Sequence, residues 1–145
     1  MLVVEGKGTP LAEHIDSASP AEVTLLVRTL AKVSVPCAGR PGRPRCRMPR
    51  VLADAGYDSD PLRAQVWQHG TELIAPHRSN RVRPATLDGR TARRLKRRWA
   101  IERTNAWLQT FRRVATRFDH SLLSYTGFVH LACAMITLNR LLKGL

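Results

Sequence analysis

The chain has 145 residues, enough for one domain with a buried core, and no second domain is expected. Lysine and arginine total 24 against 11 aspartates and glutamates, a formal net charge of +13. Such a surface attracts polyanions, because each neutralised phosphate releases counterions and arginine offers a fork that matches phosphate oxygens. The composition therefore favours a nucleic-acid partner over a merely basic soluble protein.

The cysteine pattern and the apolar stretches indicate the cellular compartment. Cys37, Cys46 and Cys133 are an odd number without Cys-x-x-Cys spacing, which predicts neither a disulfide framework nor a zinc site and fits the reducing cytoplasm. The first residues lack the basic start and the long apolar run of a signal peptide. The most apolar stretch, 128–142, is interrupted by polar residues and is too short for a membrane span. A buried terminal helix and no membrane partner are expected.

The N-terminal part predicts a hairpin followed by a helix. Residues 2–4 and 11–15 are predicted strands joined by a glycine-containing turn. Ser19 and Pro20 are typical of a helix cap and first turn, and apolar residues then recur at helical spacing to about Lys32.

Residues 39–50 form a segment rich in proline, glycine and arginine, which predicts an irregular basic loop. The run 40–44 (Arg-Pro-Gly-Arg-Pro) is similar to the short arms that enter a DNA minor groove, although its extra proline departs from that pattern. The favoured interpretation is a loop that contacts phosphates through Arg43 and Arg45 or is simply solvated.

A strand, a helix and a second strand are predicted next. Residues 50–53 form an apolar run, predicted to be a buried strand, that stops at Asp54. A helix over 60–68 and a strand over 71–76 follow, and this spacing predicts a parallel pair within a mixed sheet. Residues 77–89 form a polar loop rich in arginine.

A long basic helix is predicted over 91–114. Between Arg90 and Arg117 there are ten basic residues and one acidic residue, Glu102. At 100° per residue the core-facing arc contains Ala100, Ile101, Thr104, Trp107, Leu108, Phe111 and Ala115. Glu102 lies on the opposite, polar face together with Arg98.

A second helix is predicted to begin after Ser121 and to end at Gly144. The residues expected to face the core are Leu123, Phe128, Leu131, Met135, Leu138 and Leu142.

Asp54 and Glu102 are the two carboxylates with candidate chemistry. Asp54 follows a strand at its C-terminal end, where open α/β sheets place ligand groups, but an aspartate there also caps the next turn, and position alone favours neither. Glu102 has a simpler alternative, an exposed i to i+4 pair with Arg98 worth only about 0.3–0.5 kcal/mol. Together they fit one scheme, in which both hold divalent cations while Arg98 and its neighbours bind phosphates.

Two motifs carry a family resemblance. Residues 51–59 (Val-Leu-Ala-Asp-Ala-Gly-Tyr-Asp-Ser) and 97–108 (Arg-Arg-Trp-Ala-Ile-Glu-Arg-Thr-Asn-Ala-Trp-Leu) closely resemble the catalytic domain of bacterial insertion-sequence DDE transposases, the insertion sequence 4/5 superfamily. The hairpin and the arginine-rich loop look like the same family, so the resemblance covers nearly the whole chain. It implies an α/β, ribonuclease H-like mixed sheet with flanking helices, and Asp54 and Glu102 as the second and third acids of a triad that binds Mg²⁺ or Mn²⁺.

The resemblance also implies an activity and partners. The family cleaves double-stranded DNA at element ends with water and transfers the strand with the freed 3′-hydroxyl, usually as a dimeric complex on DNA, which implies a cytoplasmic, nucleoid-associated protein. The predicted DNA-binding residues are Arg98, Arg103, Arg112, Arg113, Arg43 and Arg45.

The chain departs from the family pattern in two respects. The family's first catalytic aspartate lies on a strand before the hairpin, which this chain begins too late to include, and Glu5 in the hairpin turn is no obvious substitute. Leu95 and Gln109 stand where the family tends to have tyrosine and lysine. Residues 1–145 are therefore predicted to be a partial catalytic domain, a truncated or decayed copy without independent activity that associates with another chain. The alternative is a non-catalytic DNA-binding or regulatory protein.

Overall fold

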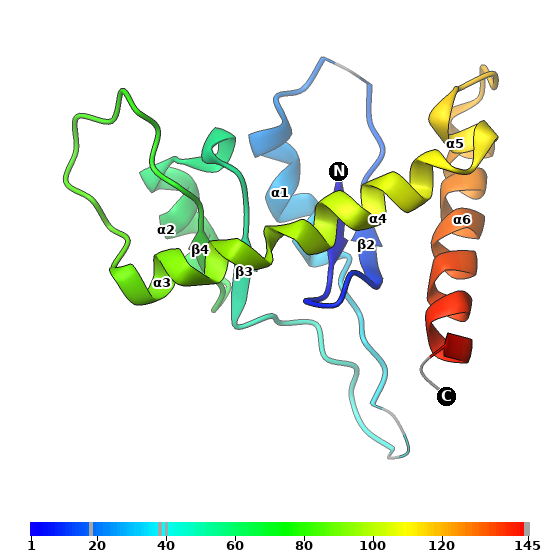
Figure 1. The fold of residues 1–145 in the computed structure, drawn as a ribbon, viewed down its shortest axis with the longest axis horizontal. Helices are drawn as coiled ribbons and strands as arrows, with labels where there is room; N and C mark the ends of the chain where they lie inside the picture. The colour runs from blue at the N-terminus through cyan, green and yellow to red at the C-terminus, as the bar shows by residue number, and fades with distance from the viewer. Residues whose placement is uncertain (18, 38, 40, 144–145) are drawn as a thin grey trace.

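The computed structural model describes residues 1–17, 19–37, 39 and 41–143 (Figure 1). Arg40 and the predicted helix end at Gly144 lie outside the described residues. The elements are β1 (Leu2–Val4), β2 (Pro10–Glu13), α1 (Glu22–Ala31), β3 (Arg50–Leu52), the 3-10 turn η1 (Ala55–Tyr57), α2 (Asp60–Gln68), β4 (Glu72–Ile74), α3 (Gly89–Arg94), the 3-10 turn η2 (Leu95–Arg98), α4 (Trp99–Gln109), α5 (Arg112–Ala115) and α6 (Leu122–Lys143).

The predicted hairpin is confirmed and is fastened to α4 at its turn. Strands β1 and β2 pair antiparallel. Gly8 in the turn has a φ of +89°, and a Cβ there would lie 2.8 Å from the Thr104 hydroxyl oxygen. That hydroxyl donates a 2.7 Å hydrogen bond to the Gly8 carbonyl. Only glycine allows both this backbone conformation and this close approach, and the contact fixes the hairpin against the helix that carries Glu102.

The strand–helix–strand unit is also confirmed. Strands β3 and β4 pair in parallel, and Ser59 caps α2 by accepting a 3.4 Å hydrogen bond from the Leu62 N–H. Strand β3 is half-buried or exposed rather than buried, because one of its edges has no neighbouring strand among the described residues.

The predicted single mixed sheet is wrong for the described residues, which instead form two separate strand pairs, β1–β2 and β3–β4. A groove of about 1240 Å³ is lined by both β1 and β3. Helix α1 packs against both strand pairs. Leu26 belongs to the core cluster of α2 and β4, and Leu30 packs against both this cluster and the cluster of the hairpin.

The start of α1 differs from the prediction. The helix begins at Glu22 after Ala21, whose side chain makes no capping bond, so Ser19 is not the cap. The Thr24 hydroxyl bonds to the Ala21 carbonyl at 2.7 Å and supports the first turn from within the helix.

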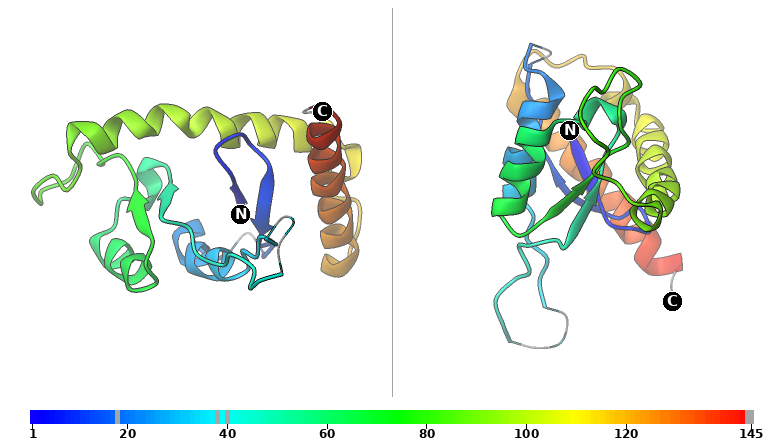
Figure 2. Two further views of the ribbon diagram at one scale, coloured as in Figure 1. Left: turned by 90° about the horizontal axis from the view of Figure 1, so that it is seen from below. Right: turned by 90° about the vertical axis from the view of Figure 1, so that its left-hand side faces the viewer.

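The predicted continuous helix over 91–114 is interrupted. Elements α3, η2 and α4 follow one another as a nearly straight rod along one edge of the molecule (Figure 2), and the chain turns at Phe111 before the short α5. The Thr110 hydroxyl bonds back to the Trp107 carbonyl at 2.7 Å, a local bond that competes with helix continuation. Of the predicted core-facing arc, Ala100, Thr104 and Leu108 are buried and Ala115 is exposed.

Helix α6 packs through a different face from the one predicted. Val129, Ala132 and Ile136 are buried, and Ala132 and Ile136 form a core cluster with Leu108 of α4. The small Ala132 lets α4 approach closely. Of the six residues predicted to face the core, Phe128 is half-buried outside that cluster and the other five are exposed: Leu123, Leu131, Met135, Leu138 and Leu142.

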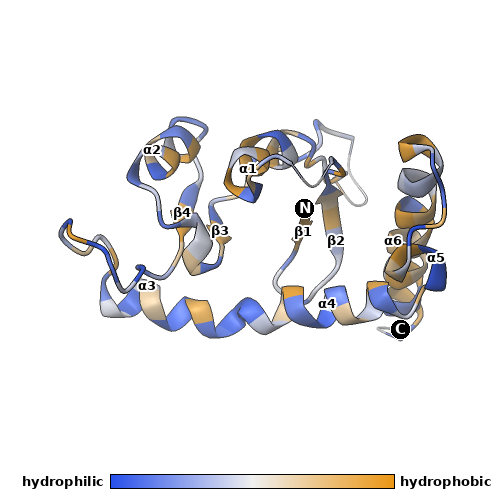
Figure 3. Cartoon of the chain, turned by 90° about the horizontal axis from the view of Figure 1, so that it is seen from above, coloured by the Kyte–Doolittle hydropathy of each residue, from blue (hydrophilic) through white to orange (hydrophobic). Residues whose placement is uncertain are grey.

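Helix α6 is longer than its most apolar stretch. It starts at Leu122, directly after Ser121 as predicted, and hydrophobic residues cover most of it (Figure 3). By length and composition alone its 22 residues could cross a membrane, a test that the core helix of a soluble protein also passes. One face of the helix contacts α4, α5 and β2, as in a helix of a globular domain.

Candidate active site

Asp54 stands at the end of β3, with extended backbone, where it starts η1. Its Oδ1 accepts a 2.7 Å hydrogen bond from the Ala55 N–H, so the turn-capping interpretation is confirmed. Its side chain is 64% exposed, and within the described parts of the chain its Oδ2 makes no hydrogen bond. The carboxylate therefore caps a turn and still has an oxygen free to bind a ligand.

Arg98 brings Asp54 and Glu102 together. Its Nη1 lies 3.0 Å from Asp54 Oδ1, and its Nη2 lies 3.9 Å from Glu102 Oε1. The predicted i to i+4 pair is thus confirmed, but the same guanidinium also reaches the strand-end aspartate. Ion pairs this exposed contribute about 0–1 kcal/mol each, so a ligand can replace them at little cost.

The two carboxylates lie on the wall of the groove between β1 and β3. The groove is also lined by a basic set contributed mainly by α3 and η2: Arg50, Arg93, Arg94, Arg97 and Arg98. The lining contains four further acids, Glu5, Glu13, Asp16 and Glu22, so the groove as a whole carries both signs of charge. Asp54 and Glu102 are the two acids that share the Arg98 guanidinium.

Arg103 lies on α4 but points away from this pair. Its guanidinium carbon is 4.4 Å from the Trp99 ring centroid and 4.7 Å from that of Trp107, and it donates a hydrogen bond to the Lys7 carbonyl. These contacts hold the hairpin on α4. A role of Arg103 in DNA binding stays a prediction.

The other predicted DNA-binding arginines are exposed. Arg112 and Arg113 lie on α5, where the Arg113 guanidinium pairs with Asp119 at 3.7 Å and covers the Phe128 ring. Arg43 and Arg45 lie on the irregular loop, and the backbone of Arg45 forms an isolated bridge with Val35. The structure does not bring these four residues to the Asp54 groove, of whose lining they are not part.

The donor set fits a divalent metal in part. Carboxylate oxygens are the ligands that Mg²⁺ and Mn²⁺ prefer, and Asp54 and Glu102 share one guanidinium that a cation can replace. Within the described ranges no group of three histidine, cysteine, aspartate or glutamate residues is arranged to hold a metal. The two acids can therefore supply two ligands, and the others must come from water, nucleic acid or a further carboxylate.

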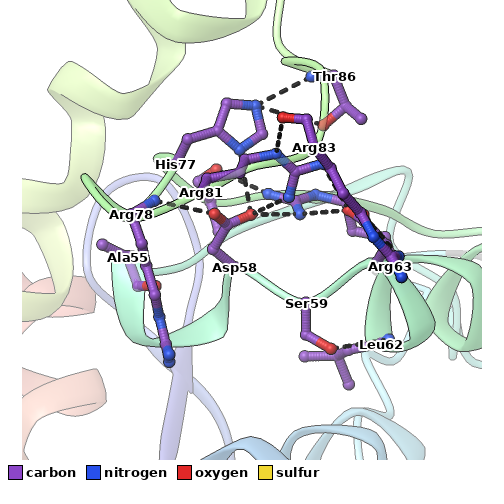
Figure 4. Close-up of polar contacts among 12 residues, drawn as sticks. Ala55, Asp58, Ser59, Leu62, Arg63, His77, Arg78, Arg81, Arg83 and Thr86 are labelled. Carbon is purple, nitrogen blue, oxygen red and sulfur yellow. Dashed lines mark hydrogen bonds and ion pairs between the residues drawn. The ribbon is translucent and has the colours of Figure 1, made fainter.

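A second polar cluster, centred on Asp58, was missed by the sequence analysis (Figure 4). The Asp58 side chain is only 2% exposed. It accepts bonds from Arg63 Nη1 at 2.6 Å and from Arg81 Nη1 and His77 Nδ1, each at 3.1 Å. The backbone N–H of Arg78 donates to its second oxygen at 2.9 Å. The cluster binds the loop over 77–86 to the start of α2.

Electrostatics explain why Asp58 stays ionised. Burial alone would raise the pKa of this carboxyl, but hydrogen bonds from the Arg78 backbone, Arg63 and His77, together with the Arg63 charge, hold the pKa well below its ordinary value. A signal was present in the sequence: two acids, Asp58 and Asp60, stand about 20 residues before an arginine-rich loop. Opposite charges predict that these segments meet, but not which acid is buried.

Comparison with known proteins identifies the family of the chain. The family described as Transposase DDE domain matches residues 1–138. The chain belongs to the DDE transposase family. It is 34% identical, over 143 residues, to the protein assigned as transposase for insertion sequence element IS402 of Burkholderia cepacia, an alignment that covers 99% of this chain and 64% of that protein.

A second relative is the protein assigned as transposase for insertion sequence element IS6501 of Brucella ovis, 41% identical over 90 residues, or 61% of this chain and 66% of the relative. The DDE transposase chain thus spans about two thirds of the length of the relatives it matches. No solved structure matches it. The predicted family is confirmed, and such transposases generally depend on divalent metals.

Proposed function

We propose that this chain forms part of a transposase catalytic domain of the insertion sequence 4/5 superfamily, with a ribonuclease H-like fold, that cleaves DNA and transfers strands. Asp54 and Glu102 hold Mg²⁺ or Mn²⁺ in this proposal. The single observation that carries it is the Arg98 guanidinium, which lies 3.0 Å from Asp54 and 3.9 Å from Glu102, two acids 48 residues apart in the sequence.

The chain's own residues divide the work of the site. Asp54 and Glu102 offer oxygens to the metal, which, once bound, activates the attacking oxygen and stabilises the leaving one. Arg98, if released from the two carboxylates, would be free to bind a phosphate in a forked geometry. Arg93, Arg94 and Arg97 extend this positive wall along the groove and orient a DNA backbone.

The chain alone is proposed to lack cleavage activity, because two carboxylates are an incomplete ligand set. The groove between β1 and β3 offers a place for the missing part. Both strands have an unpaired edge there among the described residues, so a further strand from the same protein or from a complementing chain could pair with them and bring a third acid beside Asp54.

The alternative function is a non-catalytic DNA-binding or regulatory protein derived from a transposase. It is favoured by the net charge of +13 together with the lack of a third metal ligand within the described ranges. The two functions differ in one property: only a catalytic remnant binds DNA in a manner that depends on metal and on both acids.

DNA binding by residues 1–145, measured by fluorescence anisotropy on duplex DNA in Mn²⁺ or in EDTA, tests the proposal. We expect Mn²⁺ to tighten binding, and Asp54→Asn and Glu102→Gln each to remove this increment. Glu72→Gln is the matched control, because Glu72 lies on β4 outside the groove lining and pairs with Arg50 of β3. It removes one acid, as the two test variants do, and should leave the Mn²⁺ increment unchanged. Binding that is indifferent to Mn²⁺ and to both acids would establish the alternative function.

A cleavage assay on the same duplex with Mn²⁺ completes the test. We expect no strand cleavage by the chain alone. Cleavage that both Asp54→Ala and Glu102→Ala abolish would mean that another group completes the ligand set, and the proposed inactivity would be wrong.

A further inference from the structure

We propose that Asp58 is a positioning residue which, acting through Arg78, holds the turn that carries Asp54 in place beside Arg98. The inference rests on the proposed function only for the role given to Asp54. The series of hydrogen bonds that links Asp58 to Asp54 through Arg78 is present whatever that role is.

The first link joins Asp58 to the backbone of Arg78. Asp58 Oδ2 accepts the Arg78 N–H at 2.9 Å, while its Oδ1 is occupied by Arg63, Arg81 and His77. His77 is itself held, because the Thr86 N–H donates to its Nε2 at 3.0 Å. The buried carboxylate is thus bound on both oxygens, which fixes Arg78, four residues after the end of β4, and the loop around it.

The second link joins the side chain of Arg78 to the Asp54 turn. Arg78 Nε donates to the Ala55 carbonyl at 3.1 Å, and its Nη2 donates to the Gly56 carbonyl at 2.7 Å. Both carbonyls belong to η1, the turn that starts at Asp54. The N–H of Ala55 in turn donates to Asp54 Oδ1. A guanidinium that binds two successive carbonyls sets the orientation of the turn, and the turn sets the direction of the Asp54 carboxylate.

Asp60 shows why this role falls on Asp58. Asp60 is also an aspartate in the same cluster, and it pairs with Arg81 at 2.9 Å and Arg83 at 3.2 Å. It also accepts a bond from Arg63 Nη1 at 3.3 Å, and within the described residues it makes no hydrogen bond or ion pair with Arg78 or with η1. Asp60→Asn therefore removes the same charge from the same cluster without breaking the route to Asp54.

Amide hydrogen exchange, measured residue by residue by NMR on the metal-free full chain, tests the proposal. The reporters are the N–H groups of Ala55, which bonds to the Asp54 side chain, and of Tyr57, which bonds to the Asp54 carbonyl at 2.9 Å. We expect Asp58→Asn and Arg78→Ala each to speed their exchange by about tenfold or more, since charge-assisted bonds are lost. Asp60→Asn should change these rates by less than about twofold.

The double variant Asp58→Asn/Arg78→Ala should exchange at the same rate as Arg78→Ala, because both changes break one route. Arg78→Ala keeps the backbone bond to Asp58 and removes only an exposed side chain, so it serves as the test if Asp58→Asn does not fold. The exchange rates of amides in the buried part of α1 report whether each variant is folded overall.

Three results would overturn the proposal: unchanged rates in Arg78→Ala, equal acceleration by Asp60→Asn, or additive effects in the double variant. These rates are measured without metal or DNA. If Asp54 and Glu102 fail to affect Mn²⁺-dependent DNA binding, the proposed function fails, and the exchange rates still decide whether Asp58 positions the turn.

Discussion

Asp54 and Asp58 stand four residues apart on one turn, and their surroundings are opposite. The Asp58 side chain is 2% exposed and is bound by two arginines, a histidine and a backbone N–H. The Asp54 side chain is 64% exposed and has one backbone N–H and one arginine. Removing Asp58 would break a buried network and leave two largely buried arginines with one carboxylate, Asp60, in place of two, whereas removing Asp54 leaves little unsatisfied.

The contrast separates a carboxylate that stabilises the fold from one that is available to a ligand. A fully satisfied buried acid has no free oxygen for a metal, while Asp54 retains one. The same logic applies on α4, where Thr104 is buried and bonded to the hairpin and Glu102 is exposed. In both elements a buried, hydrogen-bonded residue lies within four residues of the exposed acid that we propose as a ligand.

The largest expected effect is on stability, from Asp58→Ala. Because it breaks a buried network and leaves Asp60 as the remaining carboxylate partner of Arg63 and Arg81, we expect it to lower the free energy of unfolding by about 3 kcal/mol, the lower end for breaking a buried ion pair. Asp54→Ala should cost no more than about 1 kcal/mol. Urea denaturation followed by circular dichroism measures both. Equal losses in the two variants would remove the distinction between the two aspartates.

The next expected effect is on the pH dependence of stability. The pKa of Asp58 is lower in the folded than in the unfolded protein, so its stabilisation is complete above the unfolded pKa of about 3.9 and is lost as pH falls below it toward the folded pKa. Asp58→Asn should flatten the fall in stability below about pH 4 relative to the wild type. Denaturation midpoints across acidic pH test this, and an acid limb that is unchanged in Asp58→Asn would contradict it.

A smaller effect is expected from Gly8→Ala, which tests the contact that places α4. The φ of +89° and the 2.8 Å approach to Thr104 Oγ1 should together cost about 1–3 kcal/mol. Gly6→Ala in the same turn, where nothing lies within 4 Å, is the matched control and should stay within about 0.5 kcal/mol. Thermal melts compare the two, and similar losses in both would mean that the hairpin is not fastened at Gly8.

The smallest stability effect is expected from Arg98→Ala, less than about 1 kcal/mol, because both its ion pairs are exposed. Its effect should instead be on DNA binding, where the slope of log K against log salt falls by about 1 on loss of one phosphate contact. Arg98→Lys keeps the charge without the fork and separates charge from geometry. An unchanged salt slope in Arg98→Ala would show that Arg98 does not reach a phosphate.

Local signals predicted much of the fold. The Gly-containing turn, the strand ending at Asp54 and the helix over 60–68 all correspond to observed elements, because they depend on residues close in sequence. The predicted inner face of α6 was wrong, because which face packs depends on where α4 lies, and the small Ala132 decides that contact. Strand patterns could not show whether the four strands form one sheet or two pairs. The patterns identify strands, but whether β1 and β3 belong to one sheet depends on what lies in the groove that both of them line.

The residues of the candidate site were predicted from the sequence, but the contacts that hold them in position were not. Asp54, Glu102 and Arg98 were predicted from their motifs, and the structure brings them together. Arg103 was predicted as a DNA contact, yet its position between Trp99 and Trp107 depends on the turn at Lys7, 96 residues away. Asp58 was not singled out, because burial of one acid among several follows from the folded path of the 77–89 loop.

Metal-directed cleavage of the polypeptide tests the central claim most directly, namely that Asp54 and Glu102 share one metal site. Fe²⁺ takes the place of Mg²⁺ at carboxylate sites, and with ascorbate and peroxide it produces radicals that cut the backbone close to the ion. With duplex DNA present, the account predicts cuts near both residue 54 and residue 102, and loss of both cuts in either Asp54→Asn or Glu102→Gln. Cuts that persist near one residue when the other is substituted, or that occur only elsewhere in the chain, would contradict a shared site.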